Sequence, residues 1–277
     1  MNDSHTPNLS ALRVFLLGAG NMGGAVGRAM REAGVTGENL LVMNSSRESS
    51  ERAAEQIGAT VAPSLSEAVT DADVIVLGIK PYQLGDMLPA VVESLRPHTL
   101  VVSLAAGATI QTLQKNLGGH ELIVRTMPNT PVGVGAGVVA VMPAASVPED
   151  QTDLVERLFT ASAEVVRVPE SQVHQVIAAA GSAPAFWFYA AEAMIDEGVL
   201  QGLTRDQAAR MVVATMAGSA KLLQDSGSSP ADARYAVSSP GGTTVRGVAA
   251  LDRAGVRVGL ADAMRAAADR SREMEQG

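Results

Sequence analysis

The sequence predicts an α/β fold, in which an N-terminal doubly wound parallel sheet is followed by an all-helical C-terminal domain. Up to about residue 169, short apolar runs alternate with segments of helical spacing, which is typical of a sheet covered on both faces. Beyond that point we find no convincing strand, only long alanine-rich helical segments. We therefore expect a flexible tail over residues 1–11, a sheet domain over 12–169 and a helical domain over 170–277.

The expected strands are short, nearly continuous apolar runs, and the expected helices begin at polar capping residues. The strands are Leu12–Leu17, Leu40–Met43, Val74–Leu77, Leu100–Ser103, Leu122–Arg125, Gly137–Val141 and Val165–Val168. Helices between them are expected at Arg47–Ile57, Leu84–Leu95 and near Asp150–Thr160, with a capping box at Ser64 and Glu67. Five helices are expected in the C-terminal domain. The first is Val173–Val199, kinked or divided at Pro184, and the second runs from a capping box at Thr204 and Gln207 to near Gly227. The third begins at Ser229-Pro230, and the last two are Thr244–Arg253 and Val258–Glu273.

Composition excludes several classes of function. The 277 residues carry a formal net charge of −8, so we expect no nucleic-acid partner and no membrane partner. The chain has no cysteine, and its four histidines are scattered, so we expect no metal site and no disulfide framework. The first ten residues lack the pattern of a signal peptide and no apolar stretch is long enough to span a membrane, so we expect a cytoplasmic protein.

A glycine-rich turn after the first strand predicts dinucleotide binding. Gly18 permits the tight turn, Gly20 lets the backbone approach a pyrophosphate, and Gly23 lets the following helix pack on the strand. The helix N-terminus then presents N–H groups to the anion. The alternative is a glycine-rich turn without a ligand.

The residues after the second strand favour NADPH, with NADH as the alternative. An NAD site usually places an acid there to hold the ribose 2′-hydroxyl. Here the strand is followed by Asn44, Ser45, Ser46 and Arg47, whose hydroxyl, amide and guanidinium groups suit a 2′-phosphate. The alternative is that Ser45 or Ser46 merely caps the helix that starts near Arg47, and both roles are compatible.

Two later strand ends should face the same crevice, because ligands of doubly wound sheets bind at the carboxyl ends of the strands. Gly78, Ile79, Lys80 and Pro81 follow the third strand, although Lys80 could be an ordinary solvated lysine. Small residues, Ala105, Ala106 and Gly107, follow the fourth strand and could lie beneath a flat cofactor. After the fifth strand Asn129 offers a donor and an acceptor, and we take it as a candidate substrate ligand.

A second glycine-rich turn lies in the helical domain and leads into the helix at Thr244–Arg253. Such a helix start, with the hydroxyls of Ser239, Thr243 and Thr244, is suited to a small carboxylate. Gly241 and Gly242 lie within the turn. The alternative is a helix cap with a hinge and no ligand.

These motifs together resemble the pyrroline-5-carboxylate reductase family, over Leu12 to Arg272. The residues that carry the resemblance are Gly18-x-Gly20-x-x-Gly23, Lys80-Pro81, Ala105-Ala106-Gly107, Met127-Pro128-Asn129-Thr130-Pro131, Gly181-Ser182-Ala183-Pro184-Ala185-Phe186 and Ser239-Pro240-Gly241-Gly242-Thr243-Thr244. The resemblance implies a Rossmann domain, a C-terminal dimerisation domain and reduction of 1-pyrroline-5-carboxylate to L-proline by NAD(P)H. The hydride would reach the imine carbon, which becomes C5 of proline.

The resemblance also implies roles for individual residues. The implied cofactor contacts are Leu17, Gly18, Ala19, Gly20, Asn21, Met22, Asn44, Gly78, Ile79, Lys80, Pro81, Ala105, Ala106 and Gly107. The implied substrate contacts are Ser239, Gly241, Gly242 and Thr244, with Ser239 and Thr244 as the candidate catalytic side chains. We expect a homodimer through the C-terminal helices, with a larger ring such as a decamer as an alternative.

Two rival functions are compatible with the same layout. A β-hydroxyacid or imine dehydrogenase would typically need a lysine on the first C-terminal helix, and Val173–Val199 contains none. A protein that senses NADP without catalysis would keep the first glycine turn but would not need Ser239 and Thr244.

Overall fold

The computed structural model describes residues 8–276, and the chain divides into two compact units. Unit 1 comprises Met1–Gly181 and Ala267–Gly277, and unit 2 comprises Ser182–Ala266. The division lies after the expected boundary at residue 170, since Val173 is buried in the same small apolar cluster as Met142 of the sheet. Residues 1–7 of the expected flexible tail lie outside the described residues.

The remainder of that tail is folded. Leu9–Ala11 form a 3₁₀ helix, η1, and Asn8 caps it by accepting a hydrogen bond from the Ser10 amide. Leu9 is buried in the core of unit 1, and the Asn39 side chain donates to the Ser10 carbonyl at 2.7 Å. This segment is therefore part of the sheet unit.

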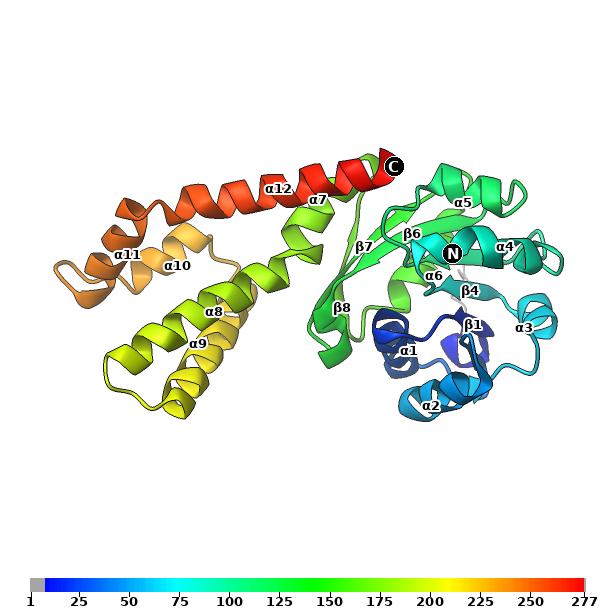
Figure 1. Ribbon diagram of the computed structural model, residues 1–277, viewed down its shortest axis with the longest axis horizontal. Coiled ribbons are helices and arrows are strands. Elements are labelled where there is room, and N and C mark those ends of the chain that lie inside the picture. Colours follow the sequence, from blue (N-terminus) through cyan, green and yellow to red (C-terminus); the bar gives the residue numbers. More distant parts are fainter. Residues whose placement is uncertain (1–7, 277) are drawn as a thin grey trace, which may run out of the picture. The chain divides into compact units, whose positions relative to one another are not determined.

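Unit 1 is built on an eight-stranded sheet with the order β3-β2-β1-β4-β5-β6-β7-β8 (Figure 1). The strands are β1 Val14–Leu17, β2 Leu40–Met43, β3 Thr60–Val61, β4 Val74–Leu77, β5 Leu100–Ser103, β6 Ile123–Pro128, β7 Gly137–Pro143 and β8 Ala163–Arg167. Every neighbouring pair is parallel except β6 and β7, which are antiparallel. The order reverses between β1 and β4, so the carboxyl ends of these strands form the switch point where ligands of such sheets bind.

Helices cover both faces of the sheet, and successive residues of each central strand face opposite cores. In β1, Val14 and Leu16 belong to one buried cluster and Phe15 and Leu17 to the other. The first cluster includes residues of α1 (Asn21–Ala33), α2 (Arg47–Ile57) and α6 (Glu149–Arg157), and the second includes residues of α3 (Leu65–Asp71), α4 (Leu84–Val92) and α5 (Ile110–Asn116). This two-sided burial explains why the strands are continuously apolar.

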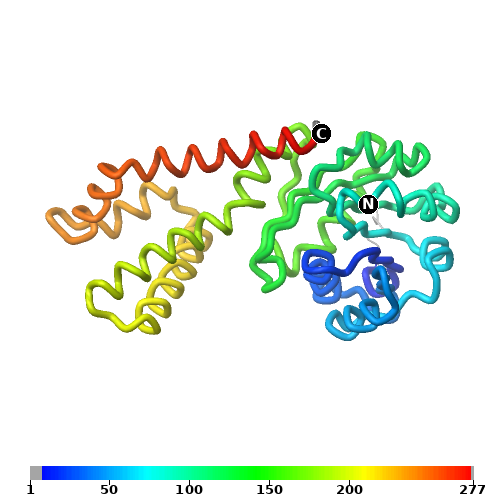
Figure 2. Tube along the Cα trace, viewed as in Figure 1, coloured from blue at the N-terminus to red at the C-terminus, as the bar shows by residue number. Residues whose placement is uncertain are grey.

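Unit 2 is helical, as the alanine-rich sequence predicts, and Figure 2 follows its chain through successive helices. They are α8 Ala183–Leu200, α9 Arg205–Ser226, α10 Pro230–Ala236, α11 Thr243–Arg253 and the first turns of α12 Val256–Gln276. The expected Val173–Val199 helix is interrupted: α7 (Val173–Val176) runs into a π-helical turn at Ile177–Gly181, and Pro184 lies in the first turn of α8. The capping box of Thr204 and Gln207 is present, and Ser229 caps α10.

Many apolar side chains of unit 2 are exposed in the single chain. On α8, Trp187, Phe188 and Tyr189 are 61%, 67% and 76% exposed. None of the described helices combines the length and the apolar character that a bilayer span requires. Exposed aromatic side chains in such number mark a surface that another molecule covers.

Candidate active site

Two of the three glycines in the first turn are required by the backbone itself. Gly18 follows β1 with a φ of +95°, a left-handed conformation that side chains disfavour. A Cβ atom on Gly23 would overlap the carbonyl oxygen of Gly18. The turn and the close packing of α1 on β1 therefore depend on these two glycines.

Gly20 has a different role, because no atom outside its immediate neighbours lies within 4 Å of a Cβ placed on it. Its φ of −74° is open to any residue, and it is the N-cap of α1 without a side chain to cap the helix. The first-turn N–H groups of a helix have no partner within the helix. An uncapped start facing open space fits a pyrophosphate, so the residues present suit a dinucleotide.

The loop after β4 packs directly against this turn. A Cβ on Gly18 would lie 2.7 Å from the carbonyl carbon of Gly78 and 2.7 Å from the amide nitrogen of Ile79. The backbones of both loops therefore touch at the switch point, and only glycine at both positions allows this approach. The structure thus brings together two of the expected cofactor segments, Leu17–Met22 and Gly78–Pro81.

The Asn44 side chain joins the glycine turn to the loop after β2. Its Oδ1 accepts a hydrogen bond from the Ala19 amide at 2.7 Å, and its Nδ2 donates to the Ser49 carbonyl at 3.0 Å. Both amide atoms therefore have protein partners. Asn44 therefore holds the glycine turn to the loop after β2.

The other polar residues of the β2 loop are exposed, and one of them also caps α2. Ser46 caps α2 by accepting from the Ser49 amide, in a reciprocal capping box. Ser45 is exposed, and the Arg47 side chain is 84% exposed with its Nε donating to Glu51 at 2.8 Å. Ser45, Ser46 and Arg47 are all exposed at the start of α2, where a cofactor phosphate would be accessible, and Glu48 beside them is exposed as well.

The remaining cofactor segments lie at the ends of β4 and β5. Lys80 is exposed, its amide donates to the Gln83 side chain at 3.0 Å, and Pro81 opens a short 3₁₀ helix, η2 (Pro81–Gln83). The Ala105 amide donates to the Ser103 hydroxyl at 3.2 Å, and Ser103 is fully buried. This role of Ser103 is not among the sequence predictions, although a polar residue that ends an otherwise apolar strand is a signal for it.

Asn129 is held by the backbone on both sides. Its Nδ2 donates to the Ala180 carbonyl at 3.3 Å and its Oδ1 accepts from the Val138 amide at 2.8 Å, and the residue is 8% exposed. These bonds fix the loop after β6, including the 3₁₀ helix η3 (Thr130–Val134), which packs on α1. The amide groups that suggested a ligand role thus have structural partners.

The second glycine turn lies in unit 2 between α10 and α11. The Gly242 amide donates to the Ser239 carbonyl at 3.0 Å, and Gly241 has a φ of +73°. Gly242 is the N-cap of α11 and provides no side-chain cap, while Ser239, Thr243 and Thr244 are exposed. This turn therefore presents hydroxyl groups beside an uncapped helix start, which suits a small anion.

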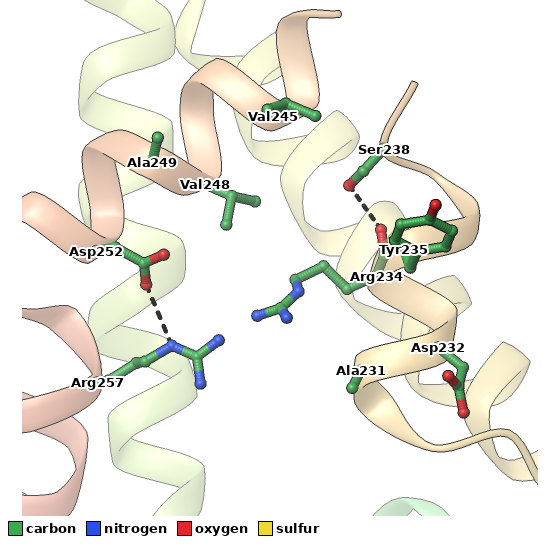
Figure 3. Close-up of a pocket in the computed structure, with 10 residues that line it drawn as sticks. All are labelled: Ala231, Asp232, Arg234, Tyr235, Ser238, Val245, Val248, Ala249, Asp252 and Arg257. Atoms are coloured by element: carbon green, nitrogen blue, oxygen red, sulfur yellow. Dashed lines mark hydrogen bonds and ion pairs between the residues drawn. The ribbon is translucent and has the colours of Figure 1, made fainter. Parts of the chain in front are cut away.

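A groove of about 530 Å³ runs beside this turn, between α10 and α11 (Figure 3). Arg234 and Arg257 point into the same space, and Arg257 also pairs with Asp252 at 3.1 Å. Val245 and Val248 of α11 supply an apolar wall. The groove includes Ser238 but not the residues expected to bind substrate. Among the described residues, no cluster of acids and histidines could hold a metal ion.

Comparison with known proteins assigns both parts of the chain. Residues 170–274 match the family described as pyrroline-5-carboxylate reductase dimerisation, and residues 13–107 match NADP oxidoreductase, coenzyme F420-dependent. The pyrroline-5-carboxylate reductase of Escherichia coli is 35% identical over 266 residues, which is 95% of this chain and 98% of that protein. The chain belongs to the pyrroline-5-carboxylate reductase family.

Solved structures of pyrroline-5-carboxylate reductases agree with this assignment. The enzyme of Coxiella burnetii has 30% identity and a TM-score of 0.89, covering 95% of this chain and 98% of that one. The NADP-bound structure from Plasmodium falciparum has 26% identity and a TM-score of 0.82, covering 96% and 99%. The expected fold, a doubly wound parallel sheet followed by a helical domain, is confirmed, except that β7 runs antiparallel to β6.

Proposed function

We propose that this chain reduces 1-pyrroline-5-carboxylate to L-proline with NADPH, with NADH as an alternative donor. The observation that carries the proposal is that one reductase-family chain contains both an open, uncapped glycine turn and an uncapped, hydroxyl-rich helix start. The first suits a dinucleotide and the second a carboxylate. We also propose a cytoplasmic location, because a chain without cysteine fits a reducing compartment.

In this proposal the cofactor lies along the carboxyl ends of β1, β2, β4 and β5. The backbone of Gly18–Met22 receives the pyrophosphate, and Ser45 and Arg47 receive the 2′-phosphate, with Asn44 and Ser46 shaping their loops. Gly78–Pro81 and Ala105–Gly107 border the rest of the cofactor. The bound nicotinamide supplies a hydride, which is chemistry that no protein side chain provides.

The substrate carboxylate is received by the turn before α11. The backbone N–H groups of Gly241 and Thr243 and the Ser239 hydroxyl donate to it, while the Gly242 amide keeps its bond to the Ser239 carbonyl. The Thr244 hydroxyl hydrogen-bonds the ring nitrogen. We assign Asn129 to loop support, since both of its amide atoms already pair with backbone groups. Ser239 and Thr244 are thus the side chains that orient the imine.

The reaction makes modest demands on the protein. The substrate is a cyclic imine, and once its nitrogen is protonated the imine carbon is a strong electrophile. Thr244 and the α11 N-terminus then have to orient the ring, and orientation alone supplies a large part of a rate enhancement. A dedicated general base is unnecessary because no proton is removed from carbon.

We propose that the chain assembles as a homodimer through the C-terminal helices, with a decameric ring as the larger alternative. The match to a dimerisation family over residues 170–274 supports homo-oligomerisation. The exposed aromatic residues of α8 supply apolar surface that a second copy would bury.

The deciding experiment follows the absorbance of NADPH with purified protein and pyrroline-5-carboxylate, and chromatographic detection of proline. We expect NADPH consumption to match proline formation. A β-hydroxyacid oxidised with NADP⁺, while the imine is inert, would favour the dehydrogenase alternative. Tight NADPH binding without turnover of either substrate would favour a sensing protein.

A further inference from the structure

A charged side chain lies on an interior strand of the sheet and has no part in the proposed site. Arg125 of β6 is fully buried. Its two terminal nitrogens donate to different carboxylates, Nη1 to Glu170 at 2.9 Å and Nη2 to Glu275 at 2.7 Å. Even a paired buried charge adds little net stability, because the cost of removing the charges from water offsets their attraction, so stability alone does not explain this arrangement.

Glu170 also accepts a hydrogen bond from a backbone amide at the start of a helix, and Glu275 does not. The same Oε1 atom that accepts from Arg125 also accepts from the Ile110 amide at 2.7 Å. Ile110 is the first residue of α5 and follows Thr109, the N-cap, directly. A carboxylate at a helix start satisfies an unpaired N–H group and interacts favourably with the helix dipole.

The Ile110 bond fixes the end of a segment that begins at β5. At the other end of this segment, the Ala105 amide donates to the buried Ser103 hydroxyl. Between these two anchors lie Ala106, which is exposed, and Gly107, which has a φ of +84°. The loop that carries the expected cofactor contacts is therefore held at both ends by side chains outside the loop.

We propose that Glu170, held by Arg125, is a positioning residue for the nicotinamide cofactor. Glu170 acts by fixing the segment Ala105–Ile110 at the carboxyl end of β5, next to the switch point, and does not touch the cofactor. Arg125 neutralises Glu170 and directs its Oε1 toward the Ile110 amide. This inference rests on the proposed function, in which Ala105–Gly107 border the cofactor.

The second arm of the cluster provides a matched control. Glu275, on the last turns of α12, pairs with Arg125 and approaches His174 Nε2 at 3.4 Å. His174 in turn pairs through Nδ1 with the Ser271 hydroxyl at 2.9 Å. Truncating Glu275 removes one ion pair from the same guanidinium but leaves the bond to Ile110 in place.

The test compares Glu170→Ala and Glu275→Ala in the full-length protein, by thermal unfolding, by fluorescence titration with NADPH and by amide hydrogen exchange of residues 105–110. We expect both variants to melt earlier than wild type. Only Glu170→Ala should raise the NADPH dissociation constant, by up to about tenfold, because the energy of one charge-assisted hydrogen bond within the protein limits the effect on cofactor binding. Glu170→Ala should speed exchange in residues 105–110 more than Glu275→Ala does, since Glu275 reaches this segment only through the neighbouring Met274 carbonyl, which lies near Gly107.

Two further variants keep the test decisive. Glu170→Gln retains an acceptor for Ile110 and should bind NADPH within about twofold of wild type, since the hydrogen bond rather than the charge positions the loop. Glu170→Asp keeps the charge beside Arg125 but is one methylene shorter, and it replaces the alanine variant if that variant does not fold. It should raise the dissociation constant severalfold.

The outcomes separate this inference from the proposed function. Equal NADPH affinities for Glu170→Ala, Glu275→Ala and wild type would overturn the positioning role and leave the reductase function intact. Equal losses of affinity in both variants would also overturn it, because they would report a general loss of structure. A wild-type protein that does not bind NADPH would overturn both.

Discussion

Gly20 provides the sharpest test of the cofactor site, because the structure separates its role from folding. In Gly20→Ala the added methyl group meets no protein atom, and the φ of −74° is acceptable for alanine. Alanine reduces the entropy of the unfolded chain, which stabilises by about 0.4–1 kcal/mol, but it is a poorer N-cap than glycine by a similar amount. We expect the free energy of unfolding to change by less than about 1 kcal/mol.

Cofactor binding should respond much more strongly to the same substitution. The methyl group would occupy the open space through which a pyrophosphate reaches the first-turn N–H groups of α1. Hydrogen bonds to a charged group contribute about 1.5–3 kcal/mol each. Loss of one of them corresponds to an increase of about 10- to 100-fold in the NADPH dissociation constant, at 1.4 kcal/mol per tenfold.

Gly23→Ala is the matched control, because the same methyl group there overlaps the Gly18 carbonyl oxygen. Neither backbone can move freely, so we expect destabilisation of about 1–3 kcal/mol, as for other overpacked sites. For both variants, thermal unfolding measures the change in stability and fluorescence titration measures the NADPH dissociation constant. If Gly20→Ala binds NADPH as wild type does, the pyrophosphate does not lie on this turn.

Three further predictions concern the substrate, the cofactor phosphate and the assembly. Thr244→Val should lower kcat/KM by about 10- to 1,000-fold with unchanged NADPH affinity. A variant that loses about 1 kcal/mol of unfolding free energy but turns over normally would give Thr244 a structural role only. Arg47→Ala should raise KM for NADPH by about tenfold, which corresponds to the free energy of one charged hydrogen bond, and leave KM for NADH nearly unchanged. Equal increases of KM for both cofactors would contradict a contact between Arg47 and the 2′-phosphate. Light scattering at micromolar concentration should give a dimer or a larger assembly, and a monomer would refute the role assigned to the exposed aromatic residues of α8.

The strands were predictable from the sequence because burial on both faces leaves an unmistakable apolar run. Val74–Leu77 and Leu100–Ser103 have the expected bounds, and each alternates between two cores. The strand Thr60–Val61 escaped prediction because it has two residues, of which Thr60 is exposed. Such a strand pairs only with β2 at the edge of the sheet and carries no pattern of its own.

The boundary between the units could not be placed from the pattern of strands and helices alone. The sequence changes to helical spacing after residue 169, and the first helical turns do begin there. Val173 nevertheless packs with Met127 and Met142 of the sheet, and Glu170 bonds to Arg125 and Ile110. These contacts join residues that are far apart in the sequence, and the periodicity of a single segment cannot predict them.

The motif asparagines show why a chemically suitable side chain is weak evidence for a ligand. Asn44 and Asn129 each lie in a loop at a strand end, and each offers the donor and acceptor that a polar ligand would use. In the folded chain those atoms meet the amides of Ala19 and Val138 and two carbonyls instead. Irregular loops leave backbone groups unpaired, and burial makes an unpaired group costly, so a short amide side chain nearby is drawn to them first. The glycines are easier to interpret, because the structure distinguishes two reasons for a glycine. A methyl group added at Gly23 overlaps the backbone and should destabilise the fold, whereas a methyl group added at Gly20 enters open space and should weaken only ligand binding.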